Sequence, residues 1–527
     1  MPAFSINWLG QLAQVHAVLH ELGYIRLLAI LLFGVQVAWK LTYAFFLSPL
    51  RNIPGPFLSR VTARRSEFKA LSGNGEKATQ QDYEKYGDIY VYKPNVICIC
   101  NPKDIRAVLS SNQFRKTDLY KIFEYLGIPN VATFTDPVLA NRRRRQIHPY
   151  FNFTYLGKME SLILRHGIEA IKTRWDGLIA KNGGKPIEVN YRHDTQLATF
   201  DIIGALVFGR EFNALATNNM SYINWVSGTF FYLMLRNNFP LLAVYPFSLL
   251  VRSMKKSHDE LAEFSKESVA MRKELLAKGV DEKPADLLQA LIDAEDPESK
   301  YRMSPIEVQT ESVGMLLGGS ETSSSAISWT VHFLLLHPEH LRRAVEEVRS
   351  QFAPGHTVTF NETRAHLPYL EACIYETLRY IPAGTASFPR ISHSTGITIQ
   401  GHYIPPGVEI AVNKWAAHIH KDFWDDPLTF NPVRFLDNDE AKRNMLSFSY
   451  GQRFCIGRNL AWVEMLPILA NMLKDYDISL PEGSLFGPHN LDEHGRPKLM
   501  PTKPSVFTMP ANPERDCRMI VTNRSEV

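Results

Sequence analysis

The segment from Phe448 to Gly457 constrains this chain more than any other part of its sequence. It reads Phe-Ser-Tyr-Gly-Gln-Arg-Phe-Cys-Ile-Gly and places Cys455 between two glycines, Gly451 and Gly457. Glycine lacks a β-carbon, so it permits a tight turn and lets backbone amides approach a thiolate ligand. Arg453 adds a cation to the segment. A buried structural cysteine is the alternative, but this dense pattern of Phe, Gly, Arg and Cys favours a metal ligand.

The segment resembles the haem-thiolate loop of the cytochrome P450 superfamily. The resemblance implies haem b (iron protoporphyrin IX) as the cofactor and Cys455 as the axial ligand of its iron. Phe448, Gly451, Arg453 and Gly457 would surround the haem. A thiolate ligand pushes electron density toward the iron and favours cleavage of the O–O bond. The resemblance therefore implies an oxygen-activating enzyme.

Composition excludes several other classes of protein. The chain holds 5 cysteines among 527 residues, too few and too irregularly spaced for a disulfide framework. Cys98 and Cys100 alternate with isoleucines, as in a strand, and lack the spacing of a zinc site. The formal net charge is +4, so no overall field points to nucleic acid as a partner. These features favour an intracellular enzyme.

A long helix is expected to begin near Pro305 and to carry the oxygen-handling residues. Apolar residues recur at helical spacing on both sides of the sequence Gly-Gly-Ser-Glu-Thr-Ser at 318–323. A loop at the glycine pair is the alternative. The element is similar to the oxygen-binding segment of the P450 superfamily, which implies that Gly318 leaves space beside the haem and that the glycine pair lets the helix widen locally. Thr322 would hydrogen-bond in that space, and Glu321 would relay protons to it from solvent.

A structural triad is implied by Glu376, Arg379 and Arg434. Glu376 and Arg379 are three residues apart, so they share one face of a helix. Such a pair is common and weak on its own. The flanking sequences resemble those of the P450 core triad, in which Arg434 is the second arginine. Val433 stands where the superfamily usually has glutamate.

The two propionates of haem require several cations. Besides Arg453, the resemblance matches Arg390, and Arg144 within the run Arg142–Arg145. The superfamily often has Trp or His at the position of Ala140, so one propionate contact is missing. The other arginines of the run are expected on the protein surface, where they would help to bind an electron donor.

The sequence has neither a P-loop nor a Gly-x-Gly-x-x-Gly fingerprint, so electrons are expected from a partner protein. The resemblance implies NADPH-cytochrome P450 reductase, with cytochrome b5 as a further donor. An acidic flavin domain would dock on a basic face near the cysteine.

Residues Leu27 to Phe46 predict a transmembrane helix. The stretch is about twenty residues long, enough to cross the ~30 Å hydrocarbon core of a bilayer, and Lys40 is its only charge. A cleaved signal peptide is the alternative. Four arginines lie just beyond the span (Arg51, Arg60, Arg64 and Arg65), whereas the preceding segment carries only Arg26, so the following domain is expected in the cytosol. The prediction is a single-pass protein of the endoplasmic reticulum membrane.

The expected fold is mainly α-helical with small β-sheets: one cytochrome P450 fold behind one transmembrane helix. The predicted parts are a membrane anchor (1–48), a proline-rich hinge (49–57), a haem domain (58–512) and a polar tail (513–527) that frays. The motifs run from Arg144 to Cys455 and must converge on one haem, which argues against several domains.

The substrate pocket is predicted from small residues: Gly314 on the long helix, and Ala383, Gly384 and Thr385 after the triad helix. They indicate a roomy and weakly polar site for a lipophilic molecule. The apolar segment 230–250 is expected to line an access channel and dip into the membrane, with a core helix pair as the alternative.

The predicted function is a haem-thiolate monooxygenase that inserts one oxygen atom from O2 into a lipophilic small molecule. The sequence looks most like filamentous-fungal members that act in secondary metabolism. A reductase-independent isomerase or dehydratase and a non-enzymatic membrane haem sensor are the alternatives. The oxygen-handling element at Thr322 counts against both.

Overall fold

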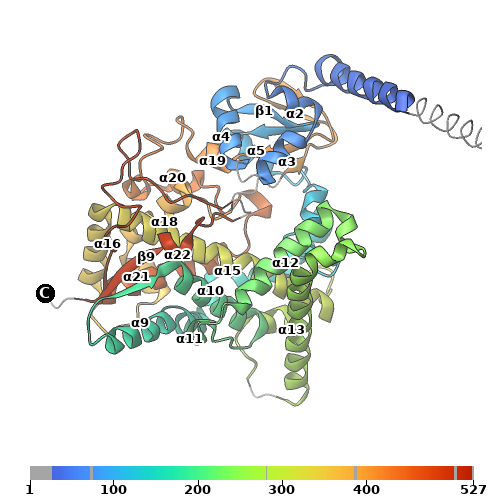
Figure 1. Ribbon diagram of the computed structural model, residues 1–527. Coiled ribbons are helices and arrows are strands. Elements are labelled where there is room, and N and C mark those ends of the chain that lie inside the picture. The colour runs from blue at the N-terminus through green and yellow to red at the C-terminus, as the bar shows by residue number, and fades with distance from the viewer. Residues whose placement is uncertain (1–25, 72–74, 280–281, 385–388, 504–506, 525–527) are drawn as a thin grey trace, which may run out of the picture.

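Helices form most of the molecule, and three small sheets lie at the edges of the helical body (Figure 1). The computed structural model describes residues 26–71, 75–279, 282–384, 389–503 and 507–524. The prediction of a mainly α-helical fold with small sheets is confirmed.

The labelled α-helices are, in chain order, α2 (Phe57–Val61), α3 (Arg64–Leu71), α4 (Gly75–Tyr86), α5 (Pro102–Ser110), α6 (Pro137–Ile147), α7 (Phe153–Gly157), α8 (Glu160–Leu164), α9 (Ala170–Lys181), α10 (Tyr191–Phe208), α11 (Ala214–Thr217), α12 (Ser221–Asn238), α13 (Arg252–Ala277), α14 (Leu287–Asp293), α15 (Pro305–Leu336), α16 (Pro338–Gln351), α17 (Phe360–His366), α18 (Pro368–Tyr380), α19 (Lys414–His418), α20 (Asp439–Asn444), α21 (Arg458–Asp475) and α22 (Pro513–Asp516). The strands are β1 (Ile89–Lys93), β2 (Val96–Ile99), β3 (Ile187–Asn190), β4 (Arg390–Ile391), β5 (Ile397–Ile399), β6 (His402–Ile404), β7 (Glu409–Val412), β8 (Tyr476–Ser479) and β9 (Arg518–Asn523). Short helical turns used below are η2 (Asp118–Phe123), η5 (Pro240–Ala243), η6 (Phe247–Val251), η7 (Pro432–Phe435) and η8 (Gly451–Arg453).

Helix α15 is the longest of the described helices and runs through the centre of the molecule beside α10 (Figure 1). A capping box begins it: the Ser304 N–H donates to the Glu307 carboxylate (2.9 Å), and the Glu307 N–H donates to Ser304 Oγ (3.4 Å). Such a box satisfies amides that the first turn leaves free. The helix passes through Gly318 and Gly319 as regular α-helix, so the expected local widening is absent there.

The largest sheet has the strand order β1-β2-β7-β4 and lies beside α2 to α5 at the top of Figure 1. Strands β1 and β2 pair antiparallel, with Tyr90 opposite Cys98, and β2 pairs parallel with β7. Cys98 and Cys100 are both buried against Tyr90, so they serve packing as expected from their alternation.

The expectation of a fraying polar tail is wrong for residues 513–523. They form α22 and then β9, the central strand of the sheet β3-β9-β8. Met519 and Val521 are fully buried, and Cys517 just before the strand is buried as well. Alternating apolar residues bury one face of the strand, and this outweighs the charges of the segment.

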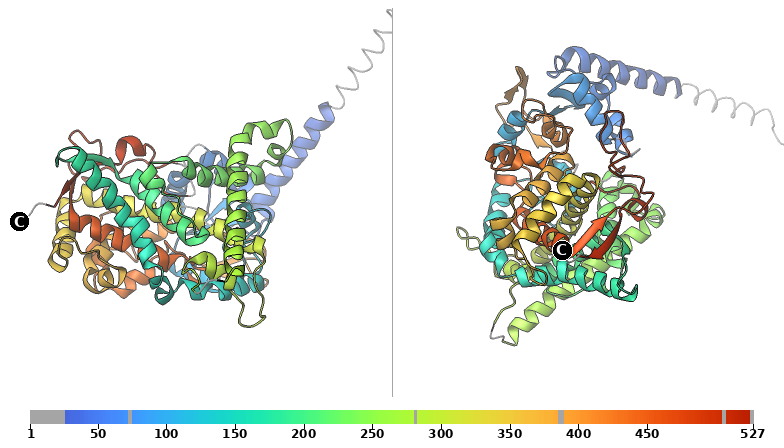
Figure 2. Two further views of the ribbon diagram at one scale, coloured as in Figure 1. Left: turned by 90° about the horizontal axis from the view of Figure 1, so that it is seen from below. Right: turned by 90° about the vertical axis from the view of Figure 1, so that its left-hand side faces the viewer.

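The N-terminal helix, Arg26–Leu47, projects away from the body (Figures 1 and 2). It is long and apolar enough to cross a membrane, and only 6% of its most apolar window is buried. The proline-rich segment after it packs on the body: Leu50 and Ile53 are buried, and the Val91 N–H donates to the Pro54 carbonyl (2.8 Å). The described helix is therefore compatible with a membrane anchor joined closely to the helical body.

Candidate active site

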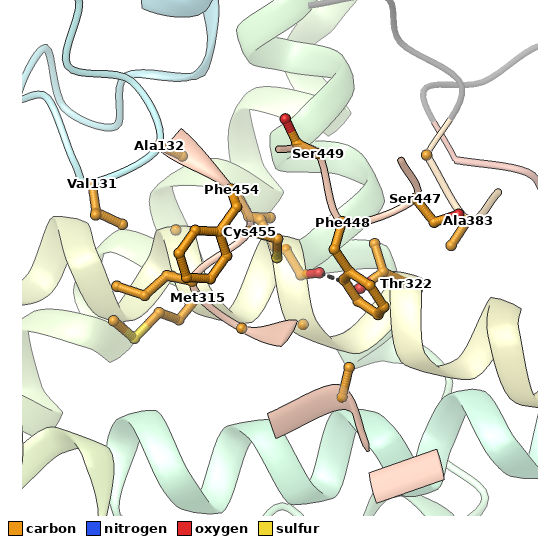
Figure 3. A pocket seen from close by; sticks show the side chains of 18 of the residues that line it. Val131, Ala132, Met315, Thr322, Ala383, Ser447, Phe448, Ser449, Phe454 and Cys455 are labelled. Carbon is orange, nitrogen blue, oxygen red and sulfur yellow. Dashed lines mark hydrogen bonds between the residues drawn. The ribbon is translucent and has the colours of Figure 1, made fainter. Parts of the chain in front are cut away.

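A cavity of about 420 Å³ lies between the cysteine segment and helix α15. Figure 3 shows Phe448, Phe454 and Cys455 on one wall, and Met315 and Thr322 on the helix that forms another. The cavity is lined by residues from many parts of the chain, and most of its lining is apolar.

The cysteine segment turns tightly so that Cys455 faces this cavity. Gly451 has φ +70°, and a β-carbon there would collide with the backbone of Leu109 and Ser110 on α5. The Cys455 N–H donates to the Phe448 carbonyl (2.8 Å), which closes the turn. The Cys455 side chain is exposed to the cavity, although it lies deep in the protein.

Opposing effects act on the pKa of Cys455. Burial raises it, while the Gly457 N–H and the charges of Arg144 and Arg458 lower it. The second group of effects stabilises a thiolate, which is the form that binds a metal. A hydrogen bond from Gly457 to the sulfur is the contact that the sequence motif implied.

Four cations converge at one side of the cavity: Lys116, Arg144, Arg390 and Arg453. Burial and the charges of the three arginines hold the pKa of Lys116 well below its usual range. Burial, followed by the charges of Arg390 and Arg144, lowers the pKa of Arg453 to about 10. Among the described residues no carboxylate pairs with Lys116, Arg144 or Arg453, and Arg453 Nε is buried without a partner. Buried cations require counter-charges, so this cluster fits a ligand that carries carboxylates.

Lys116 and Tyr120 belong to this cluster, yet sequence reasoning missed them. Lys116 pairs with Arg390 in a β-bridge, and Arg390 donates to the Tyr120 hydroxyl. Lys116 and Tyr120 line the cavity and are buried. In the sequence, Lys116 and Tyr120 belong to no recognisable motif, so nothing distinguishes them from surface residues.

The arginines of the run Arg142–Arg145 make different contacts. Arg144 lines the cavity and donates to the Phe454 carbonyl (3.0 Å). Arg143 is buried and pairs with Glu311 (2.7 Å) and with Glu307, so the expectation of a surface position is wrong for it. Arg145 pairs with Asp296 (2.8 Å). On α6 successive residues point in different directions, and this separates the four side chains.

On α15, Thr322 and Gly318 line the cavity one helical turn apart. The Thr322 hydroxyl donates to the Gly318 carbonyl (2.6 Å), which leaves the lone pairs of the Thr322 oxygen available as acceptors. A β-carbon at Gly318 would meet nothing within 4 Å, so this glycine leaves open space. Gly319 acts differently: a β-carbon there would lie 3.0 Å from Ile203, so it allows α10 to approach α15 closely.

Glu321 does not reach solvent, contrary to the expected relay path. Its carboxylate is buried, pairs with Arg192 of α10 (2.6 Å) and accepts from Gln196 Nε2 (2.5 Å). It is not among the residues that line the cavity. The direction of a helical side chain changes by about 100° per residue, so Thr322 faces the cavity while Glu321 faces α10.

Glu464 is a second buried acid that sequence reasoning missed. It lies on α21, nine residues after Cys455, and lines the cavity. Burial raises its pKa to about 8, partly offset by a hydrogen bond from Ser323, and Oε2 has no partner. Burial therefore favours the protonated form of this carboxyl group.

The structure brings the three triad residues together. Glu376 accepts from Arg379 Nε (2.7 Å) and from Arg434 Nε (3.1 Å), and both Glu376 and Arg379 are fully buried. Arg379 also donates to the carbonyls of His418 (2.7 Å) and Pro427 (2.8 Å). The triad thus joins α18 to η7 and to the loops that precede the cysteine segment.

Three of the four predicted substrate-pocket residues, Gly314, Ala383 and Gly384, line the cavity. Thr385 lies outside the described residues. Phe123, Phe230 and Phe507 add aromatic surface that the sequence prediction did not include: the Phe230 ring lies 5.3 Å from Phe123 and 5.6 Å from Phe507 between centroids.

Comparison with known proteins identifies the architecture. The family model described as Cytochrome P450 matches residues 67–507. The chain belongs to the cytochrome P450 family. It is 57% identical to cytochrome P450 monooxygenase helB3 of Aspergillus fumigatus over 93% of this chain and 97% of that protein. It is 54% identical to cytochrome P450 monooxygenase helB1 of the same fungus, over 98% of this chain and 88% of that protein.

Membership of the cytochrome P450 family explains why a cysteine and four cations line the same cavity. The P450 is a haem-thiolate monooxygenase, and the residues present fit a haem: Cys455 can hold the iron, and the four cations that line the cavity can hold the two propionates. A thiolate-ligated haem supplies oxygen activation when it is bound. The recognition of the family, the enzyme class and the monooxygenase function is confirmed.

Proposed function

We propose that this P450 inserts one oxygen atom into a lipophilic secondary metabolite, with haem b as its cofactor. The observation that carries the proposal is the aromatic surface that Phe123, Phe230 and Phe507 add to the cavity that also holds the predicted pocket residues. An apolar cavity with few polar groups selects a lipophilic molecule. The similarity to the helB proteins supports a fungal monooxygenase of this kind.

Thr322 is proposed to hold a proton at the oxygen site. Its hydroxyl is fixed by the Gly318 carbonyl, and Gly318 leaves space beside it. Glu321 is proposed to pass protons to Thr322. Its carboxylate would first have to separate from the Arg192 guanidinium. The alternatives, a reductase-independent isomerase and a haem sensor, have no use for a hydroxyl held at this position.

We propose NADPH-cytochrome P450 reductase as the electron donor, with cytochrome b5 as a further donor. Arg458 follows Cys455 by three residues and is exposed. Arg458, Arg364 and Lys442 all lie near the Tyr375 ring, and Arg364 is exposed. Glu371 pairs with Lys442 and Asp439 also lies near this ring, so the exposed Arg458 and Arg364 are the cations that would attract an acidic partner.

The test is turnover of full-length enzyme reconstituted with the reductase and NADPH, against a panel of lipophilic metabolites under labelled oxygen. The product is expected to gain one labelled oxygen atom. Turnover without reductase, or a product without labelled oxygen, would contradict the proposal.

Thr322→Ala in the same assay is expected to lower product formation by up to about a hundredfold, the lower end of what general acid–base assistance contributes. NADPH consumption should continue, with the electrons released as hydrogen peroxide, because the proton-holding group is lost while the cavity remains. Ser325→Ala is the control: its hydroxyl donates to the Thr508 carbonyl outside the cavity, so coupling should stay as in the wild type. Unchanged coupling in Thr322→Ala would remove this residue from the proton path.

We propose that the N-terminal helix anchors the protein in the endoplasmic reticulum membrane, with the haem domain in the cytosol and a boundary near Ser48. A second apolar surface supports contact with a bilayer. Leu241, Tyr245 and Leu250, in and around η5 and η6, are each more than two-thirds exposed. The chain segment that follows α12 lies on the side of the body from which the N-terminal helix projects (Figures 1 and 2).

Deleting the residues before Arg51 is expected to release much of the protein from membranes and to leave the haem spectrum unchanged. Residual binding should remain through the exposed apolar surface around η5 and η6. Sedimentation with microsomes measures the bound fraction. If the truncated protein lost its haem, the anchor would extend into the haem domain and the proposed boundary would be wrong.

A further inference from the structure

Asn130 places an amide group at the end of the cavity far from Thr322. It lies in the loop before α6, lines the cavity and is 3% exposed. Its Oδ1 accepts from the backbone N–H groups of Ala132 (2.9 Å) and Thr133 (3.2 Å). Since an N–H group donates only to an acceptor, these two bonds identify the oxygen and fix the position of Nδ2.

The Nδ2 group is directed at helix α15. A β-carbon added to Gly314 would lie 2.8 Å from Asn130 Nδ2, so the amide occupies the space that a side chain would fill. Among the described residues Nδ2 has no hydrogen-bond acceptor. Because Asn130 lines the cavity, this donor can meet an acceptor on a ligand there.

The polar neighbours of Asn130 are engaged within the protein. Glu311 accepts from the Val131 N–H (2.9 Å) and from Arg143 (2.7 Å). Thr133 Oγ1 accepts from the Asn130 N–H (2.8 Å). The bond from Val131 to Glu311 attaches the loop to α15, and the bond from Asn130 to Thr133 closes a turn within the loop, so the position of Asn130 is set before a ligand binds. Figure 3 shows Val131 and Ala132 of this loop beside the helix.

We infer that Asn130 Nδ2 donates a hydrogen bond to a hydroxyl or carbonyl oxygen of the substrate and thereby selects oxygen-bearing molecules. The inference rests on the proposed function. Gly314 and Thr322 are eight residues apart on α15, about 12 Å along the helix. A substrate that reaches from Asn130 to Thr322 is therefore elongated, and its anchored oxygen is remote from the carbon that is oxidised. Met315 and Leu317, between Gly314 and Thr322 on α15, line the cavity with apolar side chains, which favours a hydrocarbon skeleton in between.

The test uses two rigid probes that differ by one oxygen: the steroid hydrocarbon androstane and its terminal ketone, androstan-3-one. Each is titrated into full-length haem-loaded enzyme, and binding is measured from the change in the haem absorption spectrum. The wild type is expected to bind the ketone about three- to tenfold more tightly, the usual effect of one net hydrogen bond.

Asn130→Ser should bind both probes with similar affinity. A serine hydroxyl can accept the same backbone N–H groups, but it is too short to reach the Gly314 side of the cavity. Thr133→Val is the matched control, because it disturbs the same loop and leaves the amide in place. This control should keep the preference for the ketone.

Equal affinities in the wild type, a preference that survives in Asn130→Ser, or no binding of either probe would overturn the inference. The carbon monoxide spectrum of each sample separates this outcome from failure of the proposed function. A thiolate-type spectrum with no ketone preference refutes only the role of Asn130. Absence of that spectrum refutes the haem-thiolate site itself.

Discussion

Replacing Cys455 with serine is expected to abolish monooxygenase turnover. The serine hydroxyl does not ionise near neutral pH, so it cannot provide the negatively charged sulfur that favours O–O cleavage. The four cations that fit the haem propionates remain in Cys455→Ser, so some haem should still bind. Product formation and haem content, measured on the same purified sample, separate loss of the ligand from loss of the cofactor.

Cys517→Ala is the matched control for that experiment. Cys517 immediately precedes β9 in the chain and is buried beside Met500. It is not among the residues that line the cavity. This variant should keep its haem and most of its turnover. Retained turnover in Cys455→Ser would show that Cys455 is not the ligand on which the chemistry depends.

Among the substitutions described here, Glu376→Ala is expected to lower the free energy of unfolding the most. The change leaves Arg379, which is fully buried, and Arg434 without the carboxylate that both contact. Removing one partner of a buried ion pair typically costs about 3–5 kcal/mol. The loss should appear as a lower midpoint of unfolding in denaturant and as weaker haem retention, because the triad supports the loops that precede the cysteine segment.

Glu371→Ala, on the same helix, provides the comparison. Glu371 pairs with Lys442 (3.1 Å), and both side chains are partly exposed, so this pair should contribute no more than about 1 kcal/mol. Equal destabilisation by the two substitutions would mean that the triad does not hold the core of the fold.

Sequence patterns predicted those parts of the site that are local in the chain. The cysteine segment carries its own turn, since Gly451 permits a left-handed backbone and the Cys455 N–H bonds within the same segment. Helix α15 was predictable because its cap and its apolar spacing are local. The contact between Glu376 and Arg379 follows from their spacing on one helix.

Contacts between distant segments could not be predicted in the same way. Glu321 pairs with Arg192, which is 129 residues away, and the helical spacing of Glu321 does not identify this partner. Lys116 enters the cation cluster through a β-bridge to Arg390. The C-terminal residues join a sheet through β3, whose sequence lies more than 300 residues earlier. In each case the partner is determined by the tertiary fold and not by the local sequence.

The carbon monoxide difference spectrum of the reduced enzyme tests the central claim most directly. A haem ligated by the Cys455 thiolate should give the strongly red-shifted band of this family in the wild type. Cys455→His should move the band to the shorter wavelengths of histidine-ligated haems, because the ligand is changed while the cation cluster is kept. The same red-shifted band in both proteins would contradict the assignment of Cys455 as the haem ligand.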